Sequence, residues 1–194
     1  SSLSATIETA LSMGPERLAV FGYAHVPHLI PRQRRIDDSA LPDAEARFEQ
    51  AALAHAMLRQ AGYAAVGFDH FALPTDALAM AAADGTLRRN FQGYTADSCQ
   101  TLIGLGASLI SRLPGGYVQN APATAAYKQR IAQGTFPGAR GYALTPDDQL
   151  HARAIERLMC YFTLDLDALS LEYGPRAHAL APYLAEMAEQ DAGR

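Results

Sequence analysis

Two groups of polar side chains follow short apolar runs, which is where alternating strands and helices usually place their chemistry. The run RLAVFGYA leads to Tyr23, His25 and His28, and the run YAAVGF leads to Asp69 and His70. In parallel α/β folds, functional side chains gather at the carboxyl ends of the strands. These residues could therefore form one active-site rim, and the imidazoles and the carboxylate could ligate the metal of a barrel hydrolase.

The same residues also have a structural interpretation. Asp69 could cap the short helix that follows it, and the histidines could satisfy backbone groups of their loops. No third cluster supplies a further carboxylate or lysine in a recognisable pattern, so the metal hypothesis is weakly supported. Both motifs are short and common, which favours the structural interpretation slightly.

A second stretch that could bind a ligand is RRNFQGYT, at residues 88–95. Its two arginines, glutamine and aromatic rings could hold a carboxylate-bearing or planar ligand, or they could simply form a turn with surface arginines. The stretch IGLGAS lacks the spacing of a phosphate-binding loop. Gly104 and Gly106 are better explained by close packing of the backbone against a ligand or a neighbouring segment.

The first third of the chain has the element order of a parallel α/β unit. Apolar spacing predicts a helix at residues 4–13, which Gly14-Pro15 ends, and a strand follows at once. After an exposed arginine-rich loop, Pro42-Asp43 opens a second helix that Gly62 can cap, and a second strand begins there.

The rest of the sequence predicts a change from mixed to helical structure. A short helix is expected at 76–83, and strands are expected within 101–111 and 115–120. From Ala121 no further strand pattern is visible, and helices are expected at 122–132, 146–162, 165–173 and 178–190. We therefore predict an α/β part over residues 1–140 and a helical part over 141–194.

Composition excludes several classes of protein. The 194 residues carry a net charge of −4, which argues against binding to nucleic-acid backbones. The apolar runs are too short to span a membrane, and no signal peptide is visible. Cys99 and Cys160 are too few and too far apart for a disulfide framework or a zinc ribbon, so we expect a cytoplasmic protein.

Five motifs in order carry a resemblance to a known family. FGYAHVP, the stretch from Gln33 to Pro42, GFDHFALP, RRNFQGYT and GYVQN are followed by LTPDDQLHARAIERLMC. Together they resemble the oxygen-independent coproporphyrinogen III oxidases of the radical S-adenosylmethionine superfamily. The resemblance implies the C-terminal portion of a partial (β/α) barrel, followed by an all-helical segment.

The resemblance also implies chemistry and site residues. Members of the family oxidatively decarboxylate two propionates of coproporphyrinogen III to vinyl groups, using a [4Fe–4S] cluster, two S-adenosylmethionine molecules and a 5′-deoxyadenosyl radical. Ala24, Gln92 and Ile110 match positions that line the adenosylmethionine molecules. Tyr23, His25 and Tyr94 are candidates for the substrate side. The protein that supplies electrons stays unknown.

One departure from the family pattern concerns the cluster. The family holds it with Cys-x3-Cys-x2-Cys, and this sequence contains no such motif. We therefore expect a portion of the enzyme that lacks the cluster-binding part and is inactive alone, with no metal ligands of its own. Two alternatives stay open: a non-catalytic tetrapyrrole-binding relative, and a metal-dependent hydrolase that uses His25, His28, Asp69 and His70.

Overall fold

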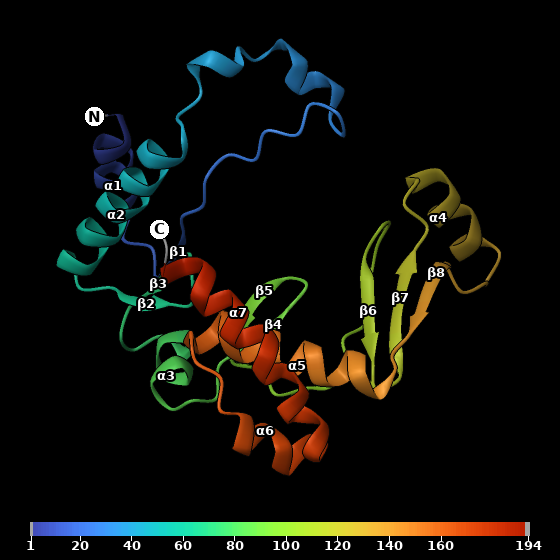
Figure 1. Ribbon diagram of the computed structural model, residues 1–194. Coiled ribbons are helices and arrows are strands. Elements are labelled where there is room, and N and C mark those ends of the chain that lie inside the picture. The colour runs from blue at the N-terminus through green and yellow to red at the C-terminus, as the bar shows by residue number, and fades with distance from the viewer. Residues whose placement is uncertain (1, 193–194) are drawn as a thin grey trace. The chain divides into compact units, whose positions relative to one another are not determined.

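The protein is described here by a computed structural model that covers residues 2–192 and shows helices mixed with short strands (Figure 1). The chain forms two compact units, one that ends at Leu87 and one that begins at Arg88. The mixed α/β class predicted from the sequence is confirmed. The boundary predicted at residue 141 stays a prediction, and within the described residues every element from Pro146 onward is a helix.

The first unit combines a helical pair with a small sheet. Its elements, in chain order, are α1 (Ser2–Ser12), β1 (Arg17–Ala19), η1 (Pro31–Arg35), η2 (Asp38–Ala40), α2 (Ala44–Gln60), β2 (Ala64–Val66), β3 (His70–Ala72) and α3 (Ala77–Ala83). Helices α1 and α2 lie side by side, and an arc containing η1 and η2 connects β1 to α2 (Figure 1). This arc carries Tyr23, Ala24 and His25.

The sheet of the first unit is antiparallel, in the order β1-β3-β2, so the predicted parallel pairing is wrong. Residues 70–72, for which the sequence predicts no strand, form the central strand of this sheet. The polar pair Asp69 and His70 interrupts the apolar pattern by which a strand is predicted, so the sequence does not indicate this one. A short apolar run also looks the same in parallel and antiparallel sheets, so periodicity could not decide the direction.

Two aspartates, Asp43 and Asp76, begin the helices of this unit. The side chain of Asp43 accepts a hydrogen bond from the N–H of Ala46 at 2.9 Å, so α2 starts one residue after the predicted Pro-Asp pair. Asp76 caps α3 by accepting from the N–H of Leu78 at 2.7 Å. The alternative in which Asp69 capped this helix is therefore wrong.

The core of the first unit lies between α1, α2 and the sheet. It contains the buried side chains of Ile7, Ala54, Leu58, Tyr63 and Phe71. Leu58 is fully buried, and the helix-to-strand turn after it uses Gly62 at φ +91°, as the predicted cap requires. This core holds the second half of α2, and the first half of that helix borders a cavity.

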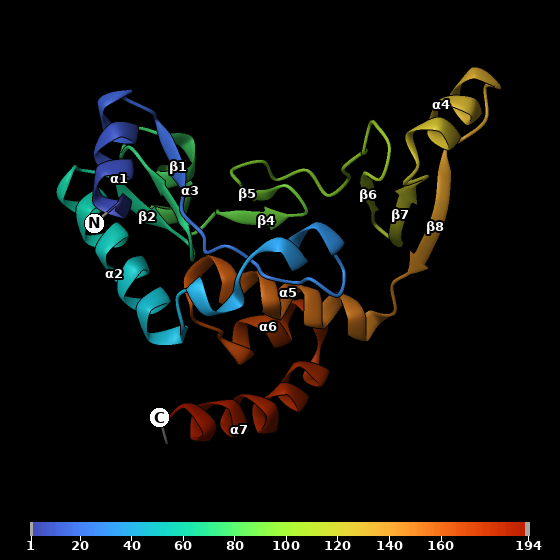
Figure 2. The same cartoon turned by 90° about the horizontal axis from the view of Figure 1, so that it is seen from above.

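The second unit begins with two small sheets and ends in helices. Its elements are β4 (Arg88–Asn90), β5 (Gly93–Thr95), β6 (Ile110–Leu113), β7 (Gly116–Asn120), α4 (Thr124–Ala132), β8 (Gly138–Ala143), α5 (Pro146–Tyr161), α6 (Leu166–Tyr173), η3 (Pro175–Leu180) and α7 (Ala181–Ala192). In Figure 2, α4 lies at the end of the β6-β7-β8 sheet that is farther from α5. The four helices expected from the sequence are all present, the last preceded by η3.

Strand β8 contradicts the prediction that no strand follows Ala121. It pairs antiparallel with β7, where Val118 faces Gly141 and Gln119 faces Arg140. Its sequence, GARGYA, has no alternation of apolar and polar residues, so backbone pairing rather than side-chain pattern defines it. The strand expected across 101–111 is also shorter than predicted, since the ladder of β6 begins only at Ile110.

The helices of the second unit pack around their own core and begin at strong caps. Thr145 and Asp148 form a reciprocal capping box at the start of α5. Leu150 and Leu169 lie in the cluster that joins α5, α6 and η3. Within residues 2–192, no helix is both long enough and apolar enough to cross a membrane.

Candidate functional site

The predicted site residues lie on loops, turns and strand ends of both units. Tyr23, Ala24 and His25 are in the connection after β1. Gln92 is in the turn between β4 and β5, and Ile110 is the first residue of β6. Each group is described within its own unit.

His25 is the most constrained side chain of the first group. Its Nδ1 atom lies 3.3 Å from the hydroxyl of Tyr23, and its Nε2 atom lies 2.7 Å from Oδ1 of Asp38. The Nε2 atom is buried and not aligned with the carboxylate as a hydrogen bond, so the contact with Asp38 is one of proximity alone. Tyr23 and His25 are therefore joined by one side-chain hydrogen bond between the hydroxyl and Nδ1.

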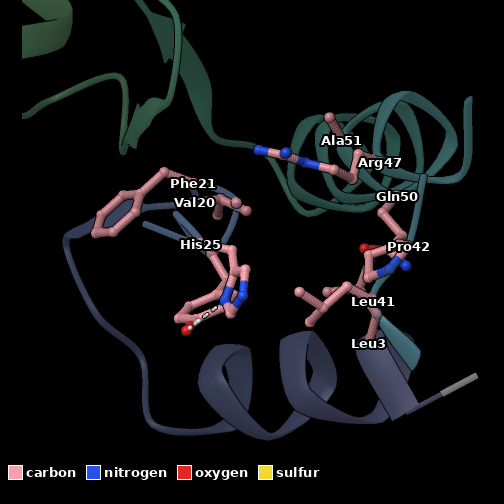
Figure 3. A pocket seen from close by; sticks show the side chains of 11 residues that line it. Leu3, Val20, Phe21, His25, Leu41, Pro42, Arg47, Gln50 and Ala51 are labelled. Atoms are coloured by element: carbon pink, nitrogen blue, oxygen red, sulfur yellow. Dashed lines mark hydrogen bonds between the residues drawn. The ribbon is translucent and has the colours of Figure 1, made fainter. Parts of the chain in front are cut away.

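A cavity of about 180 Å³ borders His25 within the first unit. Figure 3 shows Arg47 reaching from α2 toward Val20 and Phe21, while His25 faces the same space. A Cβ atom at Gly22 would lie 3.1 Å from Nη2 of Arg47, so glycine at this position leaves room for the guanidinium. The volume is below the roughly 300 Å³ of the smallest usual ligand sites, so this cavity suits one group of a ligand.

Gln33 clamps the connection that carries these residues, and sequence reasoning did not assign it this role. Its side-chain carbonyl accepts from the N–H of Val26 at 2.6 Å, and its amide donates to the carbonyl of Ala24 at 2.9 Å. The hydrogen bond from Gln33 engages the carbonyl of Ala24, whereas the methyl group of Ala24 stays exposed. The stretch from Gln33 to Pro42, one of the family-like motifs, is the sequence signal that could have revealed this role.

The hydrolase ligand set is not assembled. Asp69 contacts Nδ1 of His70 at 2.7 Å, and His25 contacts Asp38. Among the described residues, no three His, Cys, Asp or Glu side chains are placed to hold a metal ion. The structure therefore gives no support to metal-dependent hydrolysis through His28 and the other predicted ligands.

In the second unit, Gln92 and Tyr94 occupy one hairpin but differ in exposure. The backbone N–H of Gln92 donates to the side-chain carbonyl of Asn90 at 2.7 Å, which fixes the turn and leaves the Gln92 side chain exposed. The hydroxyl of Tyr94 donates to the carbonyl of Met159 at 2.9 Å. Tyr94 thus attaches the hairpin to α5, whereas Gln92 can meet a ligand.

Ile110 lies beside a glycine-rich loop that is held by Asn120. The side-chain amide of Asn120 donates to the carbonyls of Gly104 and Gly106, at 2.8 and 2.9 Å. A Cβ atom at Gly104 would lie 2.9 Å from the Cβ of Leu109. The close packing predicted for these glycines is therefore against a neighbouring segment of the chain.

A buried carboxylate, Glu156 of α5, organises the base of the RRNFQGYT hairpin. Its Oε1 atom accepts from Nε of Arg88 at 2.9 Å, and its Oε2 atom accepts from Nη1 of Arg153 at 2.8 Å. Burial raises the pKa of Glu156, but the hydrogen bonds from Arg153, Arg88 and the N–H of Arg89 outweigh it and lower the pKa overall. Sequence reasoning missed this residue because two of its partners, Arg88 and Arg89, are 68 and 67 positions away.

The two cysteines have separate environments. Cys99 is exposed, and Cys160 is buried. Burial and the nearby charge of Glu156 raise the pKa of the Cys160 thiol to about 11. A protonated thiol is a poor metal ligand and nucleophile, so Cys160 is a packing residue.

Comparison with known proteins gives one consistent result. An oxygen-independent coproporphyrinogen III oxidase from Cereibacter sphaeroides is 51% identical over 187 residues, which are 96% of this chain and 41% of that protein. The corresponding enzyme of Bradyrhizobium diazoefficiens is 47% identical over 90% of this chain and 39% of its own length. No protein-family model matches the chain.

A solved structure agrees with these relatives. Coproporphyrinogen III oxidase (HemN) from Escherichia coli, described as a radical SAM enzyme, matches with a TM-score of 0.84 and 35% identity. The match covers 95% of this chain and 44% of that one. This chain is related to one portion of the oxygen-independent coproporphyrinogen III oxidases.

The relationship confirms the resemblance inferred from the ordered motifs. It also confirms the fold expectation, since the likeness to HemN fits a C-terminal part of a radical SAM fold followed by helices. The chain spans about two fifths of the length of the curated relatives that it matches. The roles of Ala24, Gln92 and Ile110 stay predictions.

Proposed function

We propose that this chain is part of an enzyme that oxidatively decarboxylates two propionates of coproporphyrinogen III, giving protoporphyrinogen IX in haem biosynthesis. The observation that carries the proposal is the 51% identity to a named coproporphyrinogen III oxidase over 96% of the chain. The antiparallel hairpin, the buried Glu156 and the clamped Tyr23–His25 segment give this portion fixed surfaces for a ligand. We place the reaction in the cytoplasm, with an electron donor of unknown identity.

The residues of this chain do not fit an iron–sulfur cluster. The sequence holds two cysteines, Cys99 and Cys160, 61 positions apart, and the second is buried and protonated. A [4Fe–4S] cluster needs closely spaced thiolates. We therefore assign no cluster ligand to this chain and expect no activity from it alone.

S-adenosylmethionine fits the predicted residues better. When bound beside a reduced cluster, it supplies the radical chemistry that removes hydrogen from a propionate. In the first unit, the exposed methyl of Ala24 can pack against an apolar part of such a molecule. In the second unit, the half-buried Ile110 offers a similar apolar contact, and the exposed amide of Gln92 can pair with a polar end. Tyr23 and His25 are assigned to the substrate side, where the hydroxyl and the imidazole ring can exchange their mutual hydrogen bond for one to a carboxylate.

A chimera tests the proposal directly. We expect an E. coli enzyme in which the matching 44% is replaced by this chain to form vinyl groups from coproporphyrinogen III under anaerobic conditions. The reason is that the fold and most of the length of this chain match that region. The measurement is porphyrin analysis of the products, with iron content and circular dichroism as controls. A folded, iron-loaded chimera that forms no vinyl product would contradict the proposal.

Gln92→Leu in this chimera should weaken turnover at limiting S-adenosylmethionine by about 10- to 100-fold. Leucine has a similar size but cannot pair with the polar end of the cofactor, and an unpaired polar group costs about 1–3 kcal/mol. The Gln92 side chain is exposed, so the melting temperature and iron content should not change. Gln129→Leu, on the exposed face of α4, is the matched control. Equal activity of the two variants would remove Gln92 from the site.

A further inference from the structure

The largest cavity described in the second unit is separate from the residues assigned so far. Its volume is about 510 Å³, within the usual range of ligand sites. It lies between the β4–β5 hairpin, the β6–β7 hairpin and helix α5. Neither Gln92 nor Ile110 lines it.

The charge of this cavity is positive. Its lining includes four arginines, namely Arg88, Arg89, Arg112 and Arg153, and two glutamates, Glu156 and Glu172. The glutamates are already bonded to Arg88 and Arg153. Two cations are therefore left without a carboxylate among the described residues.

Arg112 and Arg89 are these two cations. Arg112 is half-buried in β6, and none of the described carboxylates forms an ion pair with it. Arg89 is exposed, and its guanidinium lies 5.6 Å from the centroid of the Tyr94 ring. A half-buried guanidinium without a counter-charge is a ready partner for a carboxylate, which it can bind through two parallel hydrogen bonds.

The rest of the lining is apolar and aromatic. Phe91 and Tyr117 meet edge to face, with centroids 5.1 Å apart. Phe91 and Ile155 are each more than half exposed although both border the cavity. An aromatic wall next to unpaired cations matches an apolar ring system with carboxylates on its rim.

We propose that this cavity binds one carboxylated edge of the tetrapyrrole substrate, with Arg112 and Arg89 on its propionates and Phe91 and Tyr117 against its ring. This inference rests on the proposed function, which names the substrate class. Beyond the proposed function, the inference names the cavity that binds the substrate and the residues that recognise its carboxylates. Arg112 and Arg89 act here as binding residues, through charge and hydrogen bonds.

A fluorescence titration with coproporphyrin III tests the site on the full chain. This porphyrin is the stable oxidised form of the substrate and carries the same four propionates. Arg112→Gln should raise its Kd by about 10- to 100-fold, the usual effect of losing a charge-assisted hydrogen bond. Arg89→Gln should raise it less, because that side chain is more exposed to water.

Three controls make the titration specific. Arg140→Gln, an exposed arginine of β8 that lines no described cavity, should leave the Kd unchanged. The tetramethyl ester of coproporphyrin III should bind more weakly and respond little to Arg112→Gln. S-adenosylmethionine should not displace the porphyrin. Circular dichroism melting checks that each variant is folded.

Three outcomes would overturn the inference. If wild type, Arg112→Gln and Arg89→Gln bind with the same Kd, or if wild type does not bind the porphyrin, the cavity is not the carboxylate site. Displacement by S-adenosylmethionine would likewise assign the cavity to the cofactor. Vinyl formation by the chimera is measured independently, so loss of this site leaves the proposed function to its own test.

Discussion

Glu156→Ala should lower the free energy of unfolding by about 3–5 kcal/mol, the usual cost of removing one partner of a buried ion pair. The carboxylate is only 9% exposed and accepts hydrogen bonds from Arg88, from Arg153 and from the backbone of Arg89. Without it, two guanidiniums are left close together in a half-buried site. Chemical denaturation at pH 7 measures the loss, with exposed Glu189→Ala of α7 as the control.

The pH dependence of stability gives this prediction a second test. The folded pKa of Glu156 lies below the ordinary value of 4.5, so its contribution is present above that value and is lost as the pH falls through the folded pKa. The difference between wild type and Glu156→Ala should therefore shrink in acid. A loss below about 1 kcal/mol at pH 7 would show that solvent already screens this site.

The Glu156 cluster also shows where sequence reasoning stops. Caps and apolar spacing are local, so α2, α3 and α5 were predicted within a few residues. The pairing of Arg88 with Glu156 joins positions 68 apart, and no local pattern contains that information. The stretch RRNFQGYT predicts its arginines as ligand-binding or surface residues, and it does not indicate Glu156 as their partner.

The same contrast between local and distant interactions applies to the strands and to the site residues. Strand β8 has no side-chain alternation and depends on its register with β7. Strand β3 begins at His70, so its first residue belongs to the polar pair Asp69 and His70. Strand β8 pairs with β7 across the intervening α4, and β3 pairs with its chain neighbour β2 and with the more distant β1, so no side-chain pattern within either strand defines it. Tyr23 and His25, which the motifs single out, do contact each other, since they are only two positions apart, and their role stays a prediction.

Asn120→Leu should lower the free energy of unfolding by about 2–4 kcal/mol, because two partly buried carbonyls lose their donor. The side chain is 2% exposed, and its amide is bonded to Gly104 and Gly106. Leucine fills a similar volume, so the loss reports hydrogen bonding rather than a cavity. Denaturation measures it, and hydrogen exchange should show faster opening in the glycine-rich loop before Ile110.

The neighbouring residue supplies a matched control. Gln119 also donates from its side chain to a loop carbonyl, that of Ser108 at 3.1 Å, but this bond is exposed to solvent. Gln119→Leu should therefore cost at most about 1 kcal/mol. Asn120→Asp distinguishes the effect of side-chain shape from that of hydrogen-bond donation. The carboxylate has the same size as the amide, but it has no N–H and repels both carbonyls. It should destabilise the chain at least as much as Asn120→Leu at pH 7, and full stability of Asn120→Asp would show that the amide donors do not hold the loop.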